Sequence, residues 1–554
     1  MSAGPGRITP SFRPKQVEKN PPCQLSCPNC ADIRHWIGVI AQRDKTGMSV
    51  EEAYTDAWKT ITDVNPFPAV MGRVCPHPCE SHCNRNTAEE PLAINAMERF
   101  LGDWGLEQRL PLSRLEEGPV RESIGVIGAG PSGLSFAYQL ARRGYRVTVY
   151  ERHERPGGML RYGIPDYRLP QEVLDGEIQR ILDLGVTLEL GVQIGRDVTL
   201  DELRARHDVM YLGIGAQKGR GLGIPGEGGP SVWTGTDYLE RVNRGEAIDV
   251  GRRVVVVGGG NTAIDAARTA RRAGADVTIM YRRSRTEMPA IAEEIDDAVE
   301  EGVTLLLQAA PVRIEREGDV LRSIVACRME LGEPDASGRR RPVVVPDSEF
   351  DVPADTVIAA VSQEPDVVGF ESLAGEHGRL VAQDGGALDS GVVAGGDVLG
   401  QGIAAQAIVA GRYAAEALHA RLRGLPEKPR VATMRAEVGA ESVLTEFHAP
   451  KPAAHRPRLA PDERLRSQTA EVTAGLSEEQ FLAETARCYS CGSCFGCQQC
   501  AMFCTSGCFT KLDKVEPGMY YSLSLDQCEE CGKCVAVCPC GYLELTPPNE
   551  VERR

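Results

Sequence analysis

The sequence predicts an α/β protein in which two Rossmann-like nucleotide-binding domains, one inserted in the other, are followed by a small cysteine-rich domain. Glycine-rich strand–turn–helix–strand patterns at residues 121–152 and 252–285 predict the two nucleotide-binding domains. The small domain is predicted because twelve of the chain's 19 cysteines lie between Cys488 and Cys540. At 554 residues the chain can form roughly three or four domains, each with its own core.

Composition excludes several classes of function. The 62 basic and 78 acidic residues give a formal charge of -16. This argues against nucleic acid or an anionic membrane as the main partner, because both bind basic surfaces. The first residues contain no apolar signal-peptide region, and no apolar run is long enough to cross a bilayer. We therefore expect a soluble, cytoplasmic protein without membrane insertion.

The cysteine content indicates metal or redox chemistry. Cysteines in a reducing compartment seldom form structural disulfides, and clustered cysteines favour metal sites. Only Cys327 stands apart from the clusters, and we expect it to be an ordinary core thiol.

Two runs near the C-terminus have the cysteine spacing of bacterial two-cluster ferredoxins. Three cysteines of each run hold one four-iron cluster, and the fourth reaches across to the other cluster. The spacing predicts tail site A (Cys494, Cys497, Cys500 and Cys538) and tail site B (Cys528, Cys531, Cys534 and Cys504). A pair of zinc ribbons is the alternative, since zinc also binds Cys-x-x-Cys pairs. Cys508 and Cys540 receive no role from the spacing.

The first glycine-rich pattern, RESIGVIGAGPSGLSFAYQLARRGYRVTVYER, predicts a dinucleotide site. A short apolar strand leads into Gly128, Gly130 and Gly133, an amphipathic helix follows, and a second strand ends at Glu151. The glycines allow a tight turn and the close approach of a pyrophosphate to the helix N-terminus. The acid can bond a ribose hydroxyl.

The second pattern, RRVVVVGGGNTAIDAARTARRAGADVTIMYRRSR, repeats the turn with Gly258 and Gly260 and places Ala263 in the third position. No acid ends its second strand, and Arg282 and Arg283 follow instead. The absence of the acid removes repulsion of a 2'-phosphate, and guanidinium groups can pair with one. The pattern therefore favours NADPH over NADH, although exposed arginines are also common on solvated surfaces.

Two such patterns, of which only the second carries the arginines, predict FAD at the first and a nicotinamide nucleotide at the second. The segment DTVIAAVSQEPD resembles a strand and loop returning to the first domain. Farther on, Asp397 follows a strand and can bond a ribityl chain, while the helix start at Ile403 and Ala404 can face the flavin ring. The nicotinamide domain is therefore expected to be inserted in the flavin domain.

These residues resemble the family of the glutamate synthase small subunit, which also includes the N-terminal half of dihydropyrimidine dehydrogenase. The similarity covers about residues 20–425 and includes NPFPAVMGRVCPHPCE, PLAINAMERF, GGMLRYGIPDYRLP, GGGNTAIDAARTA, YRRSRTEMPA and AGGDV. With its tail, the chain is similar to electron-transfer subunits associated with dissimilatory sulfite reductase or 2-oxoacid oxidoreductases. The resemblance implies further cofactor-binding residues at Pro131, Ser132, Gly158, Met159, Leu160, Ile164, Pro165, Gly215, Asn261, Thr262 and Gly396.

The family also implies a helical N-terminal domain with two four-iron clusters. N-terminal site A would comprise Cys27, Cys75, Cys79 and Glu98, the last where relatives have a Glu or Gln ligand. N-terminal site B would use Cys23 and Cys83, but the upstream Cys-x-x-Cys pair of the relatives is absent.

Two hypotheses could complete N-terminal site B. In the first, Cys30 replaces one missing ligand and leaves the set one short. In the second, Cys488 and Cys491 fold back from the tail, because ETARCYSCGSC is similar to the absent segment. The simpler alternative is that these two cysteines are spare or lie beside the tail clusters.

The predicted domains are a helical iron–sulfur domain (1–120), an FAD domain (121–240 and 360–425), an NAD(P)H domain (241–359), a polar linker (426–478) and a ferredoxin-like α+β domain (479–554). The resemblance implies an NAD(P)H:acceptor oxidoreductase with four 4Fe–4S clusters. Its acceptor would be a redox partner protein or ferredoxin within a larger complex, and cofactors rather than side chains would carry the chemistry. The alternatives are a glutamate synthase small subunit, a bifurcating transhydrogenase subunit and a zinc-stabilised scaffold without enzymatic activity.

Overall fold

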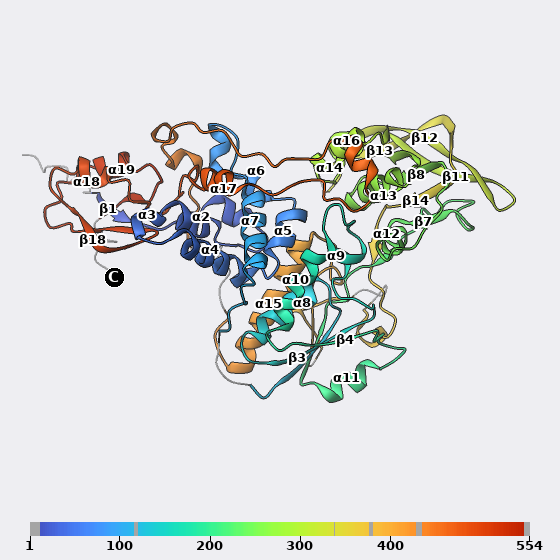
Figure 1. Cartoon of the computed structure of the whole chain (residues 1–554), viewed down its shortest axis with the longest axis horizontal. Coiled ribbons are helices and arrows are strands. Elements are labelled where there is room, and N and C mark those ends of the chain that lie inside the picture. Colours follow the sequence, from blue (N-terminus) through green and yellow to red (C-terminus); the bar gives the residue numbers. More distant parts are fainter. Residues whose placement is uncertain are drawn as a thin grey trace, which may run out of the picture. The chain divides into compact units, whose positions relative to one another are not determined.

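The structure, a computed structural model, describes residues 12–115, 120–336, 338–375, 380–389, 391–427 and 435–547. The chain, drawn in Figure 1, divides into two compact units. The first comprises Met1–Leu110, Glu427–Arg456 and Gly475–Arg554, and the second comprises Pro111–Pro426 and Pro457–Ala474. Both ends of the chain therefore belong to one unit.

The second unit contains a six-stranded sheet in the order β16-β17-β5-β2-β3-β4. Its strands are parallel except for β16, which pairs antiparallel with β17. Helix α15 packs closely on α8. Gly411 of α15 allows this close contact, since a Cβ there would lie only 2.2 Å from Ser132 O. The elements are β2 (Ser123–Ile127), α8 (Pro131–Ala141), β3 (Arg146–Glu151), α9 (Met159–Tyr162), α10 (Gln171–Leu182), β4 (Thr187–Leu190), α11 (Leu200–Arg206), β5 (Val209–Leu212), β16 (Ala387–Asp389), β17 (Val392–Ala394) and α15 (Ala404–Arg423).

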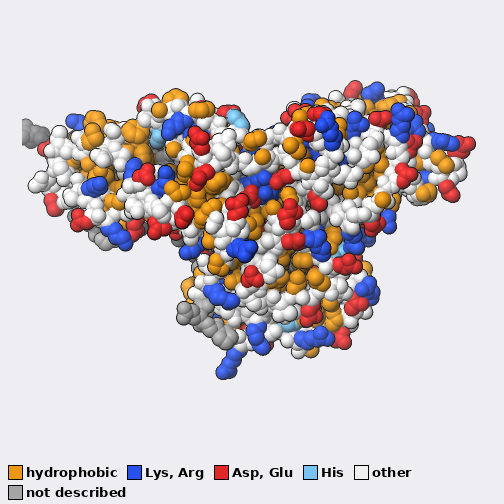
Figure 2. Space-filling view, in the orientation of Figure 1, with side chains coloured by type: hydrophobic (Ala, Val, Ile, Leu, Met, Phe, Trp, Pro, Cys, Tyr) orange, Lys and Arg blue, Asp and Glu red, His pale blue; other side chains and the backbone are white. Residues whose placement is uncertain are grey.

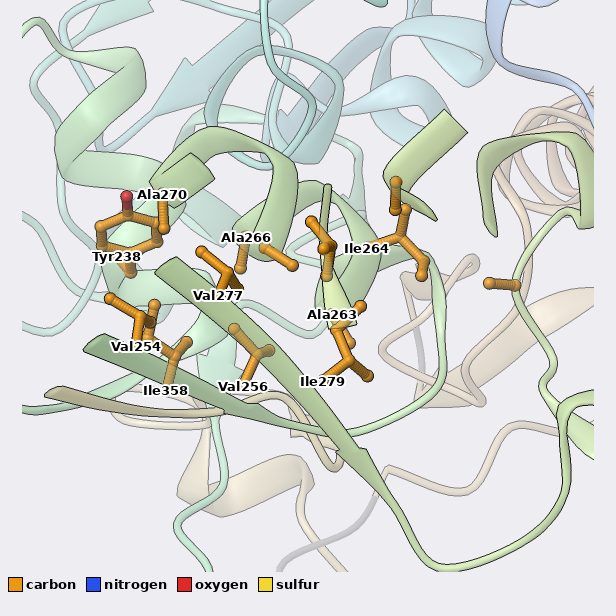
Figure 3. Packing of buried hydrophobic residues seen from close by; sticks show 14 of the residues in the cluster. Tyr238, Val254, Val256, Ala263, Ile264, Ala266, Ala270, Val277, Ile279 and Ile358 are labelled. Carbon is orange, nitrogen blue, oxygen red and sulfur yellow. The ribbon is translucent and has the colours of Figure 1, made fainter. Parts of the chain in front are cut away.

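A second, five-stranded parallel sheet in the order β10-β9-β8-β14-β7 lies between β5 and β16 in the chain. Its core packs small residues of α13 against branched residues of the central strands, as Figure 3 shows for Ala263, Ala266, Val254 and Val256. The elements are β7 (Val232–Thr234), α12 (Gly235–Asn243), β8 (Arg253–Val257), α13 (Asn261–Arg272), β9 (Asp276–Tyr281), α14 (Ala292–Glu300), β10 (Thr304–Leu307) and β14 (Thr356–Ala359).

The insertion of one Rossmann-like domain in the other is thus as predicted, although its first strand, β7, precedes the expected boundary at residue 241. The chain enters the inserted domain after β5 and leaves it after β14. A short antiparallel pair, β6 (Lys218–Gly219) with β15 (Gln363–Glu364), joins these two connecting segments. Strands β11 (Ala309–Glu317), β12 (Val320–Pro334) and β13 (Arg340–Pro353) form a separate antiparallel sheet.

The N-terminal part of the first unit is helical, as expected. The backbones of helices α5 and α7 are in contact, which glycines on both helices allow. A Cβ at Gly72 would lie 2.4 Å from Arg99 Cα, and one at Gly102 would lie 2.2 Å from Ala69 N. The helices are α1 (Pro22–Ser26), α2 (Ile33–Ala41), α3 (Arg43–Thr46), α4 (Val50–Val64), α5 (Pro68–Val74), α6 (Pro78–Ser81) and α7 (Ile94–Glu107).

The C-terminal part of the same unit consists of short elements. These are α17 (Glu478–Thr485), α18 (Gln499–Phe503), β18 (Phe509–Glu516), β19 (Met519–Leu523), α19 (Lys533–Ala536) and β20 (Leu543–Thr546). Strand β20 pairs antiparallel with β1 (Arg13–Gln16), so the two ends of the chain form one small sheet. The ferredoxin-like character of this part stays a prediction.

The segment expected to be a polar linker, 426–478, is divided between the two units. Within the second unit, α16 (Pro461–Arg466) is held by Arg464, which donates to Asp297 Oδ1 at 2.8 Å. Within the first unit, Arg456 donates to Gly72 O at 3.2 Å. Arg464 and Arg456 thus tie this segment to parts of each unit that are distant in sequence.

None of the helices in the described part of the chain combines the length and apolar composition needed to span a bilayer. On the face shown in Figure 2, basic and acidic side chains are interspersed.

Candidate functional site

The turn after β2 has the shape expected of a pyrophosphate-binding loop. Gly128 has a φ of +98°, in the region that favours glycine, and a Cβ there would lie 2.5 Å from Gly213 O. A Cβ at Gly133 would lie 2.0 Å from Gly128 O. At Gly130, the N-cap of α8, a Cβ would meet only Gly158 Cα, at 3.8 Å. The fold therefore requires the outer two glycines, whereas Gly130 leaves open space above the helix start.

Glu151 lies at the end of β3, as predicted, and is only 3% exposed. Its carboxylate accepts hydrogen bonds from Ala129 N at 2.8 Å and His153 N at 2.9 Å. It also lines a cavity together with Gly128, Gly130 and Arg152. The acid thus holds the glycine turn in place and borders the space beside it.

The loop before α9 closes onto the same turn. Gly157 N donates to Ala129 O at 2.8 Å, and a Cβ at Gly158 would lie 2.8 Å from Gly130 Cα. Met159 and Leu160 begin α9, and Ile164 O accepts a hydrogen bond from Asn243 at 3.2 Å. Pro165 O in turn accepts the backbone N–H groups of the two residues that precede Pro170. The segment containing these predicted contacts therefore meets the first glycine turn.

The third segment of this site is the start of α15. A Cβ at Gly396 would lie 2.8 Å from Ser132 Cβ, so the loop before α15 touches the start of α8. Asp397 Oδ1 accepts a hydrogen bond from Gly402 N at 3.2 Å, and burial raises the pKa of this carboxyl to about 6. Ile403 is the N-cap and Ala404 the first residue of α15. The predicted flavin contacts from three distant segments are thus adjacent.

The second glycine turn repeats the geometry of the first. Gly258 has a φ of +150°, and a Cβ there would lie 2.2 Å from Ala360 O, whereas nothing lies within 4 Å of a Cβ at Gly260. Asn261 Oδ1 accepts from Ile291 N at 2.9 Å, and Thr262 Oγ1 accepts from Gln363 Nε2 at 3.3 Å. Ala263 is fully buried against the turn. Gly215 has a φ of +67° with open space around its Cβ position.

The two arginines after β9 have different environments. Arg283 is 5% exposed, and its guanidinium donates to Arg340 O at 2.7 Å and to Asp335 Oδ2 at 2.6 Å. Arg282 is exposed. Arg283 is therefore committed to the β12–β13 hairpin, and Arg282 is the guanidinium of the pair that faces solvent.

N-terminal site A lies between α1, α6 and α7. Burial, with the negative charge of Glu98 as a further cause, raises the pKa of Cys27 to about 11 and that of Cys75 to about 12. The charges of Cys27 and Cys75 likewise add to the effect of burial on the pKa of Cys79. Burial raises the pKa of Glu98 to about 7, although Asn65 donates to Glu98 Oε1 at 2.8 Å. These four groups are thus close together and shielded from water.

Asn65, which donates to Glu98, was not predicted as a site residue. The only signal in the sequence is that it begins the NPFP motif. Cys30 lies in the turn after site A with a φ of +48°, and its N–H donates to Cys27 O at 2.8 Å.

The cysteines expected for N-terminal site B lie together with two from the tail. Four of the residues that line one cavity are cysteines, namely Cys23, Cys83, Cys488 and Cys491. Burial, followed by the charges of the other three cysteines, raises the pKa of Cys23 well above its usual range.

The tail cysteines form two further groups. One cavity is lined by Cys494, Cys497, Cys500 and Cys538, the membership predicted for tail site A, and also by Cys540. In tail site B, burial and then the charges of Cys504, Cys531 and Cys528 raise the pKa of Cys534 to about 11. The spacing did not indicate that Cys508 N–H donates to Cys504 Sγ at 3.3 Å or that Cys540 Sγ lies 3.9 Å from Cys538 Sγ.

Across the described residues, no group of three or more His, Cys, Asp or Glu side chains is arranged to hold a metal ion.

The two glycine turns in nested Rossmann-like domains define a dinucleotide-dependent oxidoreductase fold. Residues 122–414 match the family described as pyridine nucleotide-disulphide oxidoreductase. Residues 16–110 match dihydropyrimidine dehydrogenase domain II, a 4Fe–4S cluster domain. A variant of FprA from Mycobacterium tuberculosis has the same fold with a TM-score of 0.50 at 19% identity, over 55% of this chain and 85% of FprA.

Among curated proteins, the glutamate synthase (NADPH) small chain of Azospirillum brasilense is 36% identical over 74% of this chain and 88% of its own length. The chain therefore belongs to the pyridine nucleotide-disulphide oxidoreductases and, within them, to the proteins like the glutamate synthase small chain, with an N-terminal 4Fe–4S domain. The predicted family and the two nucleotide-binding folds are confirmed.

Two other relatives are the beta subunit of NADP(+)-dependent formate dehydrogenase from Moorella thermoacetica, at 41% identity, and the beta subunit of NADPH-Fe(3+) oxidoreductase from Geobacter sulfurreducens, at 40% identity. Each alignment covers 62% of this chain and 51% of the relative. The chain thus spans about half the length of these two relatives.

Proposed function

We propose that this chain is the NAD(P)H-oxidising subunit of an electron-transfer system and passes single electrons through iron–sulfur clusters to a partner redox protein. One observation carries the proposal: the chain that holds two dinucleotide turns also gathers its clustered cysteines, from both of its ends, around shared cavities. A protein that only bound nucleotide would have no need to hold so many thiols close together.

FAD would be held at the first glycine turn. The space above Gly130 would admit its pyrophosphate, and the N–H groups at the start of α8 would bond it. Asp397 would bond the ribityl chain, and the start of α15 at Ile403 would face the flavin ring. When bound, the flavin supplies the conversion between two-electron hydride transfer from the nicotinamide and single-electron transfer, releasing NAD(P)⁺ and a proton.

The nicotinamide nucleotide would bind at the second turn, where the space above Gly260 fits a second pyrophosphate. Arg282, exposed after β9, would pair with the 2'-phosphate of NADPH. Arg283 would support the site only indirectly, through its bonds to the β12–β13 hairpin. The names of these three relatives all include NADP(+) or NADPH, which supports the same preference.

Three 4Fe–4S clusters would be held by N-terminal site A and tail sites A and B. Cys79, Cys534 and Cys538 of these sites are buried and most of the other thiols are half-buried, which suits clusters because it limits solvent access to their sulfur atoms. Cys531 of tail site B is the exposed member, so this cluster would be the nearest to a partner protein. The direction of electron transfer depends on the reduction potentials of the cofactors, so electron transfer from the partner to NAD(P)⁺ is also part of the proposal.

The terminal acceptor would be a redox protein or ferredoxin, within a larger complex. Two relatives are named as beta subunits, which supports assembly with other chains. The glutamate synthase small chain is the second candidate, favoured by the alignment over 88% of that relative. That function would give no role to the two tail sites.

The proposal can be tested with two acceptors of different size. Ferricyanide is small enough to reach the flavin, whereas cytochrome c must take electrons from an exposed cluster. We expect Cys528→Ala/Cys531→Ala to keep NADPH:ferricyanide activity and to lose at least about tenfold of the cytochrome c activity, a change of about 1.4 kcal/mol in barrier. Equal cytochrome c activity in the variant and the wild type would contradict this path.

A further inference from the structure

We infer that Cys23, Cys83, Cys488 and Cys491 together hold a fourth 4Fe–4S cluster, so that the tail of the chain completes N-terminal site B. The inference extends the proposed function by one cluster. It also identifies the ligands that replace the Cys-x-x-Cys pair missing upstream of Cys23.

The four cysteines surround one cavity although they are distant in sequence. Cys23 lies in α1, Cys83 precedes the short helix Asn84–Thr87, and Cys488 and Cys491 follow α17. The remaining lining is largely apolar and includes Ile33, Ile37, Leu92 and Ile94. Four thiols around an apolar cavity are the ligand set and surroundings that a four-iron cluster requires. Each thiol would release one proton as it binds iron.

The donors around the cavity also fit a cluster. Asn84 Nδ2 lies 3.5 Å from Cys491 Sγ as a hydrogen-bond donor to the sulfur. Arg85 lines the cavity and is 2% exposed, and its Nε–H has no hydrogen-bond acceptor among the described residues. A buried donor without an acceptor is costly, and thiolate or sulfide sulfur would supply one. A cluster bound by four thiolates is anionic, so the Arg85 charge would also favour it.

Buried side chains hold the tail at this position. Arg34 Nη1 donates to Cys491 O at 2.8 Å. Arg487, which is 2% exposed, donates to Pro91 O at 3.0 Å and to Glu90 O at 2.7 Å. Ala93 N donates to Glu484 Oε1 at 2.9 Å. The tail segment is therefore anchored on both sides of Cys488 by bonds that replace water around buried groups, which defines its position.

This assignment also explains the unbroken series of Cys-x-x-Cys steps from Cys488 to Cys500. Cys488 and Cys491 turn toward the N-terminal helices, whereas Cys494 is the first ligand of tail site A. Three residues span at most about 11 Å between Cα atoms. The two clusters would therefore be neighbours, linked by one short stretch of backbone, and would give electrons a direct route into the tail.

The test compares iron content in full-length variants from each end of the chain. For the wild type we expect about sixteen irons per chain, four for each of four clusters. Cys23→Ala and Cys488→Ala should each lose about four irons, and the double variant should lose no more than either single variant. Cys327→Ala, which removes the buried cysteine of β12 outside every site, should keep the full iron content.

FAD content and the EPR spectrum of the dithionite-reduced protein, measured on the same samples, report whether the rest of the molecule is intact. Should Cys488→Ala not fold, Cys491→Ser retains the side-chain size and is expected to show the same loss of iron. Full iron in the tail variants, or a loss of about eight irons in the double variant, would overturn the inference. Zinc in place of iron in the wild type would instead refute the proposed function, so the two failures are distinguishable.

Discussion

Replacing Gly260 by alanine should separate nucleotide binding from folding. Gly260 has a φ of -91° and a ψ of 175°, which alanine adopts readily, and no atom lies within 4 Å of the added Cβ. Alanine is a poorer N-cap than glycine by about 0.5–1 kcal/mol, whereas the loss of unfolded-state entropy favours alanine by about 0.4–1 kcal/mol. The two effects nearly cancel, so the free energy of unfolding without nucleotide should change by less than about 0.6 kcal/mol.

The added methyl group would nevertheless occupy the space proposed for the pyrophosphate. We expect the Kd for NADPH to rise at least about tenfold, or 1.4 kcal/mol, in a fluorescence titration. Gly274→Ala is the converse control, because nothing surrounds its Cβ position but its φ of +98° is unfavourable for alanine. It should destabilise folding by about 1–2 kcal/mol in urea unfolding and leave NADPH affinity unchanged. An unchanged Kd in Gly260→Ala would refute the assignment of this turn to the nucleotide.

Three further predictions concern charged residues of the proposed sites. Arg282→Ala should raise KM for NADPH about tenfold and leave KM for NADH unchanged. Arg283→Ala should lower Tm, because it removes a buried guanidinium that donates to Arg340 O and to Asp335 Oδ2. In FAD-free protein, burial raises the pKa of Asp397 to about 6, so the folded state binds a proton more tightly than the unfolded state. The free energy of unfolding should then fall as pH rises from about 4 to about 6, and Asp397→Asn should remove this slope. Glu98→Ala should lose about four irons. Its control is Glu107→Ala, which changes an exposed residue at the end of α7 and should keep the full iron content. Full iron content in Glu98→Ala would exclude Glu98 as a ligand.

The nucleotide-binding part of the fold could be predicted because its signals are local. A glycine turn needs only the strand before it and the helix after it, so Gly128 and Gly258 define their domains within about thirty residues. The contacts between segments at Gly158 and Gly396 required the family resemblance, since no periodicity predicts that these loops meet the first turn.

Side chains that act over long distances in sequence could not be predicted. The partner of Arg283 is Asp335, 52 residues farther along the chain, and that of Arg464 is Asp297, 167 residues away. Both arginines have the appearance of surface residues in the sequence. The return of Cys488 and Cys491 to the N-terminal helices likewise depends on packing between the ends of the chain, so sequence alone left three alternatives open.

Anaerobic stopped-flow reduction by NADPH and by NADH tests the central claim most directly. Flavin and cluster absorbance are followed together, and iron, zinc and FAD are counted on the same sample. We expect flavin bleaching followed by cluster bleaching, faster with NADPH than with NADH. Bleaching of a flavin alone, or zinc in place of iron, would contradict the proposed path of electrons from nucleotide to iron–sulfur clusters.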